Sequence, residues 1–240
     1  MVSNAAASRL HTKGADNRYY WSMVSALSAA VLGFLLGLRH ATDADHVVAV
    51  TAIVARERTM RRAAWIGALW GIGHSITVFV VGGAIIAFRL VIPPRMGLVL
   101  EFGVALMLIV LGFSNLRAAA PAHDHGHPHD FDMRKPLLIG TVHGLAGSAA
   151  VAILVLAAIP QTVWAFAYLV VFGVGTIAGM MLVTMILAAP AMYAGERMAR
   201  LHGGIRLAAG ALSLGFGLLL ARELIVHGGL LSAVPTWSPK

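Results

Sequence analysis

The sequence predicts an all-α, polytopic membrane protein of about six transmembrane helices, arranged as a 3+3 inverted repeat. Of its 240 residues, 59% are apolar and only 12% are charged, whereas soluble domains average roughly 45–50% and about 25%. The mean hydropathy is +0.82. Apolar blocks long enough to cross a bilayer, which takes about 20 residues, alternate with short polar or basic connections. A soluble domain of this size could not hide so much apolar surface from water, so we expect lipid to be the solvent.

Six apolar blocks follow one another along the chain. They cover residues 21–55, 63–88, 96–116, 136–159, 163–189 and 204–227. The first block is interrupted by a polar cluster at 39–46, and it is too long for one straight span. Either a long tilted helix or a helix broken near the cluster fits this pattern.

The two halves of the chain resemble each other in the same order, and this is the basis for the predicted repeat. In the first pair of similar segments, His40 falls on His143. Three spans per repeat give the two halves opposite orientations, and inverted repeats place a substrate site near the membrane midplane. The aligned segments are 36–52 with 139–155, 71–80 with 173–182, and 100–118 with 206–223.

This interpretation divides the chain into five segments. Lys and Arg are more frequent in the first, third and fifth connections between spans, which predicts that these connections lie inside and both termini outside. The His-rich stretch 123–130 is typical either of a loose metal-binding tract or of a plain solvated loop. The five segments are a polar N-terminal tail (1–20), a first three-helix repeat with a candidate metal motif (21–117), a His-rich loop (118–136), a second three-helix repeat (137–230) and a C-terminal tail (231–240).

Composition and missing motifs exclude several classes of function. The chain has no cysteine, which excludes disulfides, thiolate metal sites and iron–sulfur clusters. The net charge of +8 comes from basic residues that lie between apolar blocks, so we expect contact with membrane lipid and no nucleic-acid partner. No GxxxxGK(S/T), HExxH or GxSxG motif is present, and we therefore predict neither enzymatic activity nor a cofactor. An intramembrane metal-dependent enzyme is the alternative, and it would need a water-lined site with a general base.

The polar cluster inside the first block is where the sequence points most strongly to chemistry. It holds His40, Asp43, Asp45 and His46, although a charged group at the bilayer centre costs about 2.5–3.5 kcal/mol. Imidazole and carboxylate together suit divalent transition metals such as nickel, cobalt, copper and zinc. On a regular helix His40 shares a face with Asp43 but not with Asp45, so a common ion requires a helix break or a second helix. Pairing of the acids with Arg39 and with the histidines is the alternative that needs no metal.

A further histidine, His74, lies in the uncharged second block between Gly73 and Ser75. A single buried histidine is usually a hydrogen-bonded packing residue. Here the preceding block already supplies two imidazoles, and small residues such as Gly71 and Gly73 allow helices to approach closely. We therefore expect His74 to join the same metal site.

The two segments together resemble the nickel/cobalt transporter family. The residues RHATDADH (39–46) and GIGHSITVF (71–79) are similar to the RHAxDADH and GHS-type segments that the family carries on successive helices. The resemblance is strong between residues 33 and 82 and looser over the remaining spans. It implies a permease of the bacterial inner membrane that imports Ni(II) or Co(II) as its transported substrate. Carried over residue by residue, it assigns metal binding to His40, Asp43, Asp45, His46 and His74.

Two departures from the family pattern refine this expectation. The acidic FDT-type segment of many members is replaced by HGLAGSAA (143–150), which is similar to the shorter, urease-associated nickel permeases and makes His143 a sixth candidate ligand. Related metal exporters carry Glu-Pro-Gly between their two histidines, whereas residues 42–45 here read TDAD. The resemblance therefore favours import, with export as the alternative. The sequence does not choose between nickel and cobalt, and it does not fix an oligomeric state.

A site built from histidines should respond to pH in a characteristic way. Imidazole binds metal only when neutral, and its unperturbed pKa is about 6.5. We predict that affinity for Ni(II) falls as the pH is lowered from about 7.5 to 5.5, and that Mg(II), which prefers oxygen ligands, binds poorly at any pH. Calorimetric titration with each metal measures both effects. Binding that does not change with pH, or a preference for magnesium, would show that the histidines are not the ligands.

Overall fold

The computed structural model describes residues 27, 28, 30–54, 57, 59–117, 132–145, 161–193 and 199–237. Every regular element among these residues is helical, which confirms the predicted all-α class. The N-terminal tail (1–20) and the His-rich stretch (123–130) lie outside the described residues. The predicted segment boundaries stay predictions.

Four described helices are long and apolar enough to cross a membrane: Met60–Phe88, Pro94–Arg117, Thr162–Pro190 and Gly203–Val226. The described parts of the other two predicted blocks hold shorter helices. These findings agree with a polytopic membrane protein, and the count of six stays a prediction. The helices are Ala30–His40, α2 (Ala44–Val54), α3 (Met60–Thr77), the π-helical η1 (Val78–Gly82), α4 (Gly83–Phe88), α5 (Pro94–Arg117), a helix over 134–145, α7 (Thr162–Tyr193) and α8 (Ala199–Val226).

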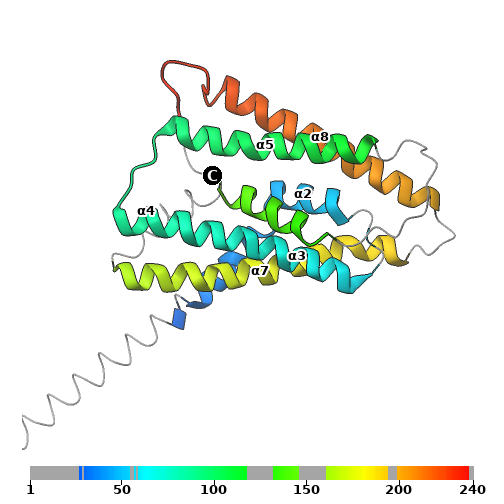
Figure 1. Cartoon of the computed structure of the whole chain (residues 1–240), viewed down its shortest axis with the longest axis horizontal. Helices are drawn as coiled ribbons and strands as arrows, with labels where there is room; N and C mark the ends of the chain where they lie inside the picture. The colour runs from blue at the N-terminus through cyan, green and yellow to red at the C-terminus, as the bar shows by residue number, and fades with distance from the viewer. Residues whose placement is uncertain are drawn as a thin grey trace, which may run out of the picture.

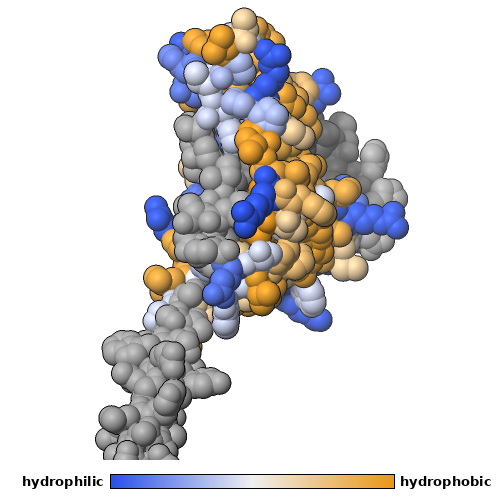
Figure 2. Space-filling view, turned by 90° about the vertical axis from the view of Figure 1, so that its left-hand side faces the viewer, coloured by the Kyte–Doolittle hydropathy of each residue, from blue (hydrophilic) through white to orange (hydrophobic). Residues whose placement is uncertain are grey.

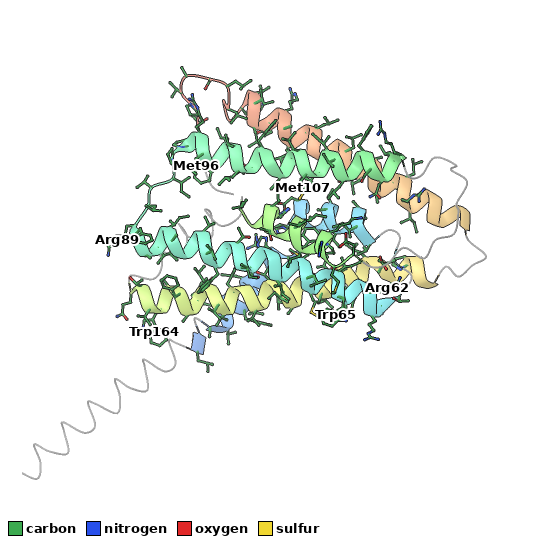
Figure 3. The ribbon with its side chains drawn as sticks, viewed as in Figure 1. Arg62, Trp65, Arg89, Met96, Met107 and Trp164 are labelled. Carbon is green, nitrogen blue, oxygen red and sulfur yellow. The ribbon has the colours of Figure 1, made fainter. Side chains whose placement is uncertain are left out.

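Tryptophan and arginine side chains lie near the ends of the long helices. Trp65, near the start of α3, and Trp164, near the start of α7, are exposed at opposite ends of the bundle (Figure 3). Arg62 and Arg89 lie at the two ends of the continuous run from α3 through α4. Trp is enriched at both membrane–water interfaces, and both Trp and Arg serve as interfacial anchors of transmembrane helices. On the face shown in Figure 2, much of the described surface is apolar, and hydrophilic residues occur singly or in small groups.

The long helices form two antiparallel pairs, α3 with α7 and α5 with α8 (Figure 1). In the second pair, a Cβ at Gly112 would meet the backbone of Gly210 and Leu214, and one at Gly217 would meet the backbone of Ala105. Residues early in α5 therefore lie beside residues late in α8. Without side chains at these glycines the two backbones touch, as is usual for helix packing in lipid.

Two shorter helices are seated on the α3–α7 pair through glycines. The helix Ala30–His40 lies against α7, where Gly37 faces the backbone of Phe172 and Gly175 faces that of Phe34. The helix over 134–145 lies against α3 in the same manner, because Gly140 faces the backbone of Trp70 and Gly73 that of Leu137.

Each short helix runs parallel to the long helix that carries it. Gly33 lies beside Tyr168 and Gly179 beside Leu38, so residue numbers rise together along Ala30–His40 and α7. They also rise together along 134–145 and α3, where Gly144 lies beside Thr77. Because α3 and α7 are antiparallel, the two short helices point into the bundle from opposite ends.

The first helix ends at His40, and α2 begins at Ala44 after a short turn. The turn is closed by backbone bonds from Thr42 N–H to the Arg39 carbonyl (2.8 Å) and from Asp43 N–H to the His40 carbonyl (3.1 Å). The Thr42 hydroxyl also donates to the Arg39 carbonyl at 2.6 Å. Of the two arrangements that the sequence allowed, the broken helix is therefore the one observed, and its break coincides with the polar cluster.

The glycine contacts give a direct test of the fold. Gly140→Ala places a Cβ against the carbonyl oxygen of Trp70, and overpacking of this kind costs about 1–3 kcal/mol. We expect a lower melting temperature in detergent, followed by tryptophan fluorescence. Gly103→Ala is the matched control, because a Cβ there meets nothing within 4 Å and alanine favours a helix by about 1 kcal/mol. Equal melting temperatures for the two variants would contradict the packing described.

Candidate metal centre

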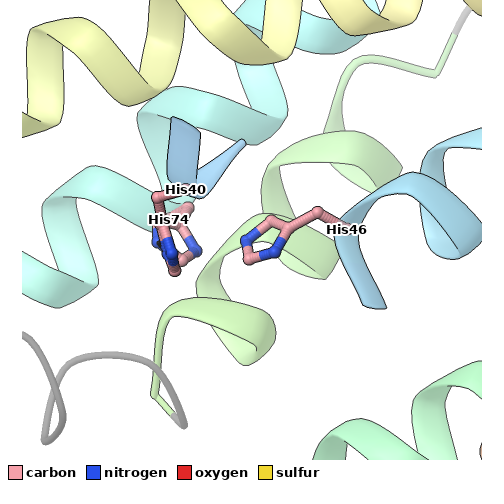
Figure 4. A group of neighbouring side chains, drawn as sticks. All are labelled: His40, His46 and His74. Atoms are coloured by element: carbon pink, nitrogen blue, oxygen red, sulfur yellow. Dashed lines mark hydrogen bonds between the residues drawn. The ribbon is translucent and has the colours of Figure 1, made fainter. Parts of the chain in front are cut away.

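Four imidazoles meet in the middle of the bundle, each from a different helix. His40 ends the first short helix, His46 is in the first turn of α2, His74 is in α3 and His143 is in the helix over 134–145. His46, His74 and His143 are almost fully buried, at 2%, 0% and 2% exposure. Figure 4 shows His46 extending from α2 toward the neighbouring rings of His40 and His74.

The first group of possible ligands consists of His40, His46 and His74. One ligand atom from each lies within 4.8 Å of the others, and the Nε2 atoms of His40 and His74 are 3.2 Å apart. Two nitrogens on opposite sides of a metal ion are about 4.2 Å apart when each bond is about 2.1 Å. Only a small contraction would therefore bring these three side chains onto one ion.

The second group consists of Asp45, His46 and His143, again with one ligand atom from each within 4.8 Å. The carboxylate of Asp45 accepts hydrogen bonds from His46 Nδ1 (3.1 Å) and from His143 Nε2 (3.0 Å). It also accepts the backbone N–H of His46 at 3.0 Å. A carboxylate that holds imidazoles in this way fixes their orientation, a common arrangement around metal-binding histidines.

Three ring nitrogens in this cluster have no hydrogen-bond partner within the described chain: His46 Nε2, His74 Nδ1 and His143 Nδ1. A buried polar atom without a partner costs about 1–3 kcal/mol, and such atoms are few in native proteins. A metal cation would satisfy lone pairs of these rings. The first short helix also ends at the cluster, so the negative end of its dipole points toward a bound cation.

Asp43 plays a smaller part than the sequence predicted. It bonds His40 Nδ1 at 2.8 Å, as expected for two residues on one helical face, but its side chain is 49% exposed. It belongs to neither group of three. Among the described residues the acids pair with histidines, and no ion pair joins either acid to Arg39. Of the pairings that would make a metal unnecessary, only those between Asp and His are therefore observed among the described residues.

The structure adds two aromatic residues that the sequence analysis missed, Trp70 and Phe172. Trp70 is fully buried and packs against His46 and His143, with ring centroids 6.3 and 5.9 Å apart. Phe172 packs against His40 at 5.4 Å. Trp70 immediately precedes the segment 71–80, and Phe172 immediately precedes the aligned segment 173–182. The alignment of the two halves was therefore the sequence signal that could have indicated both residues.

Comparison with known proteins shows the family to which the chain belongs. A family model described as high-affinity nickel-transport protein matches residues 26–119. The urease accessory protein UreH of Bacillus sp. (strain TB-90) is 32% identical over 220 residues, which cover 86% of this chain and 96% of the relative. The chloroplast protein FOR GROWTH AND FERTILITY 2 of Arabidopsis thaliana is 24% identical over 212 residues, covering 81% of this chain and 56% of that protein. No solved structure matches.

Together the apolar helices and the family match define a multi-pass membrane transport protein for a transition-metal ion. The chain belongs to the nickel-transport family, and it is similar over most of its length to the urease-associated type. The predicted family, the membrane class and the absence of enzymatic function are confirmed by this membership. The roles of the individual site residues stay predictions.

The contacts of Asp45 lead to a prediction about the two acids. Asp45→Asn keeps the size of the side chain but replaces one accepting oxygen by an amide NH₂, so only one imidazole keeps its acceptor. We expect the affinity for Ni(II) to fall by about 10–100-fold, as for other groups that orient metal-binding histidines. Asp43→Asn is the control, because the Asp43 side chain bonds His40 alone among these histidines and is half exposed. Calorimetry on both purified variants measures the difference, and equal losses would rule out the special role of Asp45.

Proposed function

We propose that this protein imports Ni(II) or Co(II) and carries the ion on intramembrane His and Asp side chains. The observation that supports this most is the cluster of four imidazoles at the centre of an apolar bundle, with three buried nitrogens lacking a partner within the described chain. Such a cluster is costly in lipid unless a cation completes it. The ligands we assign to the ion are His40, Asp45, His46, His74 and His143, and we assign Asp43 to the edge of the site as the hydrogen-bond partner of His40.

The direction and the energy source follow from charge. A double positive charge moved inward gains about 4.6 kcal/mol per 100 mV of membrane potential, which corresponds to roughly thousandfold accumulation. No nucleotide hydrolysis is then required, in agreement with the missing phosphate-binding loop. The segment TDAD at 42–45, in place of the exporters' Glu-Pro-Gly, supports import. We place the protein in the bacterial inner membrane.

We also infer that the two halves are inverted repeats. Gly37 faces the backbone of Phe172, and Gly140 faces that of Trp70. In the sequence alignment, Gly37 corresponds to Gly140, and Trp70 and Phe172 occupy matching places before the aligned segments. The same contact is thus made twice, once by each half. Antiparallel pairing of α3 with α7 and of α5 with α8 supports a twofold axis in the membrane plane.

The proposal is tested by reconstituting the purified chain alone into liposomes and measuring uptake of labelled nickel and cobalt under an imposed potential, inside negative. We expect uptake of at least one of the two metals, and little uptake of Mg(II), because imidazole ligands disfavour it. Uptake should stop when the potential is collapsed. No uptake of either metal at any potential would contradict the proposed function.

Single histidine variants identify the carriers of the ion. His40→Ala and His46→Ala should each reduce nickel uptake to background, because each removes a ligand from a group of only three. His227→Ala is the control, since His227 is 61% exposed near the end of α8 and its ring lies 3.8 Å from the Glu223 carboxylate. Size-exclusion chromatography in detergent shows whether each variant is folded. Normal uptake by a folded His40 or His46 variant would remove that residue from the site.

A further inference from the structure

We infer that the centre holds two successive metal-binding positions, and that His46 passes the ion from one to the other. This inference rests on the proposed transport of nickel or cobalt. The first position consists of His40, His46 and His74, and the second consists of Asp45, His46 and His143. His46 is the member that both groups share, so it is the residue through which an ion can move between them.

The two positions belong to helices that come from opposite ends of the bundle. His40 ends the short helix carried by α7, and His143 lies in the short helix carried by α3. The sequence alignment pairs these same two histidines. The first half of the chain therefore contributes His40 to the first position, and the second half contributes His143 to the second. Helix α2 supplies His46, which both positions share.

The distances between the rings suit a short transfer. The His46 ring centroid is 4.7 Å from that of His40 and 5.2 Å from that of His74. It is only 4.1 Å from that of His143. His74 and His143, which belong to different positions, are farther apart at 6.0 Å. His46 thus lies between the two positions and contacts the imidazoles of both.

The two nitrogens of His46 have different surroundings. Nδ1 lies 3.1 Å from Asp45, which belongs to the second position. Nε2 is buried and has no partner within the described chain. An imidazole with one nitrogen beside a carboxylate and the other free can keep hold of an ion while its remaining ligands are exchanged.

The direction of the two short helices indicates the order in which the positions are filled. Exposure does not rank the positions, because each has one partly exposed member, His40 at 17% and Asp45 at 34%. The distribution of Lys and Arg predicts that the N-terminal end lies outside, so the helix ending at His40 comes from that side. An ion entering from outside would meet the first position before the second.

The experiment uses Co(II) as the probe, because the visible spectrum of this ion changes with its ligands and geometry. The purified full-length chain and the variants His74→Ala, His143→Ala and His46→Ala are titrated in detergent, with His227→Ala as the control. His74→Ala removes a ligand from the first position only, and His143→Ala from the second only. His74→Asn and His143→Asn replace the two Ala variants if those do not elute as folded protein.

We expect the His74 and His143 variants each to bind Co(II), with visible spectra that differ from one another. The His46 variant, which lacks a ligand at both positions, should bind at least about 100-fold more weakly, because neither position keeps its full set of ligands. In liposomes, all three variants should transport nickel at background rates, because transfer requires both positions.

Two outcomes would overturn the inference. Loss of Co(II) binding in the His74 and His143 variants, as complete as in the His46 variant, would indicate one undivided site. Identical spectra in the two variants, or normal transport by either, would show that the positions are not used in succession. Failure of the proposed function is distinguishable, because it appears as absent nickel and cobalt uptake by the unmodified chain, whatever the spectra of its variants.

Discussion

The close approach of helix backbones at glycines is the contact on which the rest of this structure depends. In lipid no hydrophobic force drives helices together, so association relies on tight packing and on satisfied polar groups. Gly37 brings the first short helix onto α7, and Gly140 brings the second onto α3. These contacts determine how deep each short helix sits. Since His40 and His143 are carried by those helices, the same contacts place both imidazoles at the middle of the bundle.

The helix break after His40 explains how the side chains of the polar cluster at 39–46 reach a common centre. On a continuous helix His40 and Asp45 would point in different directions. The turn at 41–43 lets α2 start in a new direction, so that His46 faces His40 while Asp45 reaches His143. The turn carries its own hydrogen bonds, which is the condition for irregular backbone at membrane depth. The free-energy cost of interrupting the helix is offset by the contacts that His46 then makes with residues of three other helices.

Glycine contacts that occur twice and a set of histidines that does not repeat are found together in this protein. Glycine contacts of the same kind occur in both halves, and His40 aligns with His143. His46 and His74 have no such counterpart, because the positions aligned with them hold Ala149 and Thr176. The proposed inverted repeat would let the protein open toward either side of the membrane, whereas the proposed ligands, which do not repeat, would give the ion different surroundings along its route.

The sequence by itself determined the class of protein and predicted most residues of the candidate site, because both rest on local information. Apolar blocks reveal spans one at a time, and a charged cluster inside such a block is costly enough to mark a function. It also showed that His40, Asp45 and His46 could share an ion only if the helix broke or a second helix approached. Only the tertiary structure decided which of these occurs, that Asp45 bridges His46 and His143, and that Asp43 stays at the edge. The structure also decided that Trp70 and Phe172 pack against the histidines. Contacts between distant segments depend on how closely glycines let helices pack, and no single segment carries that information.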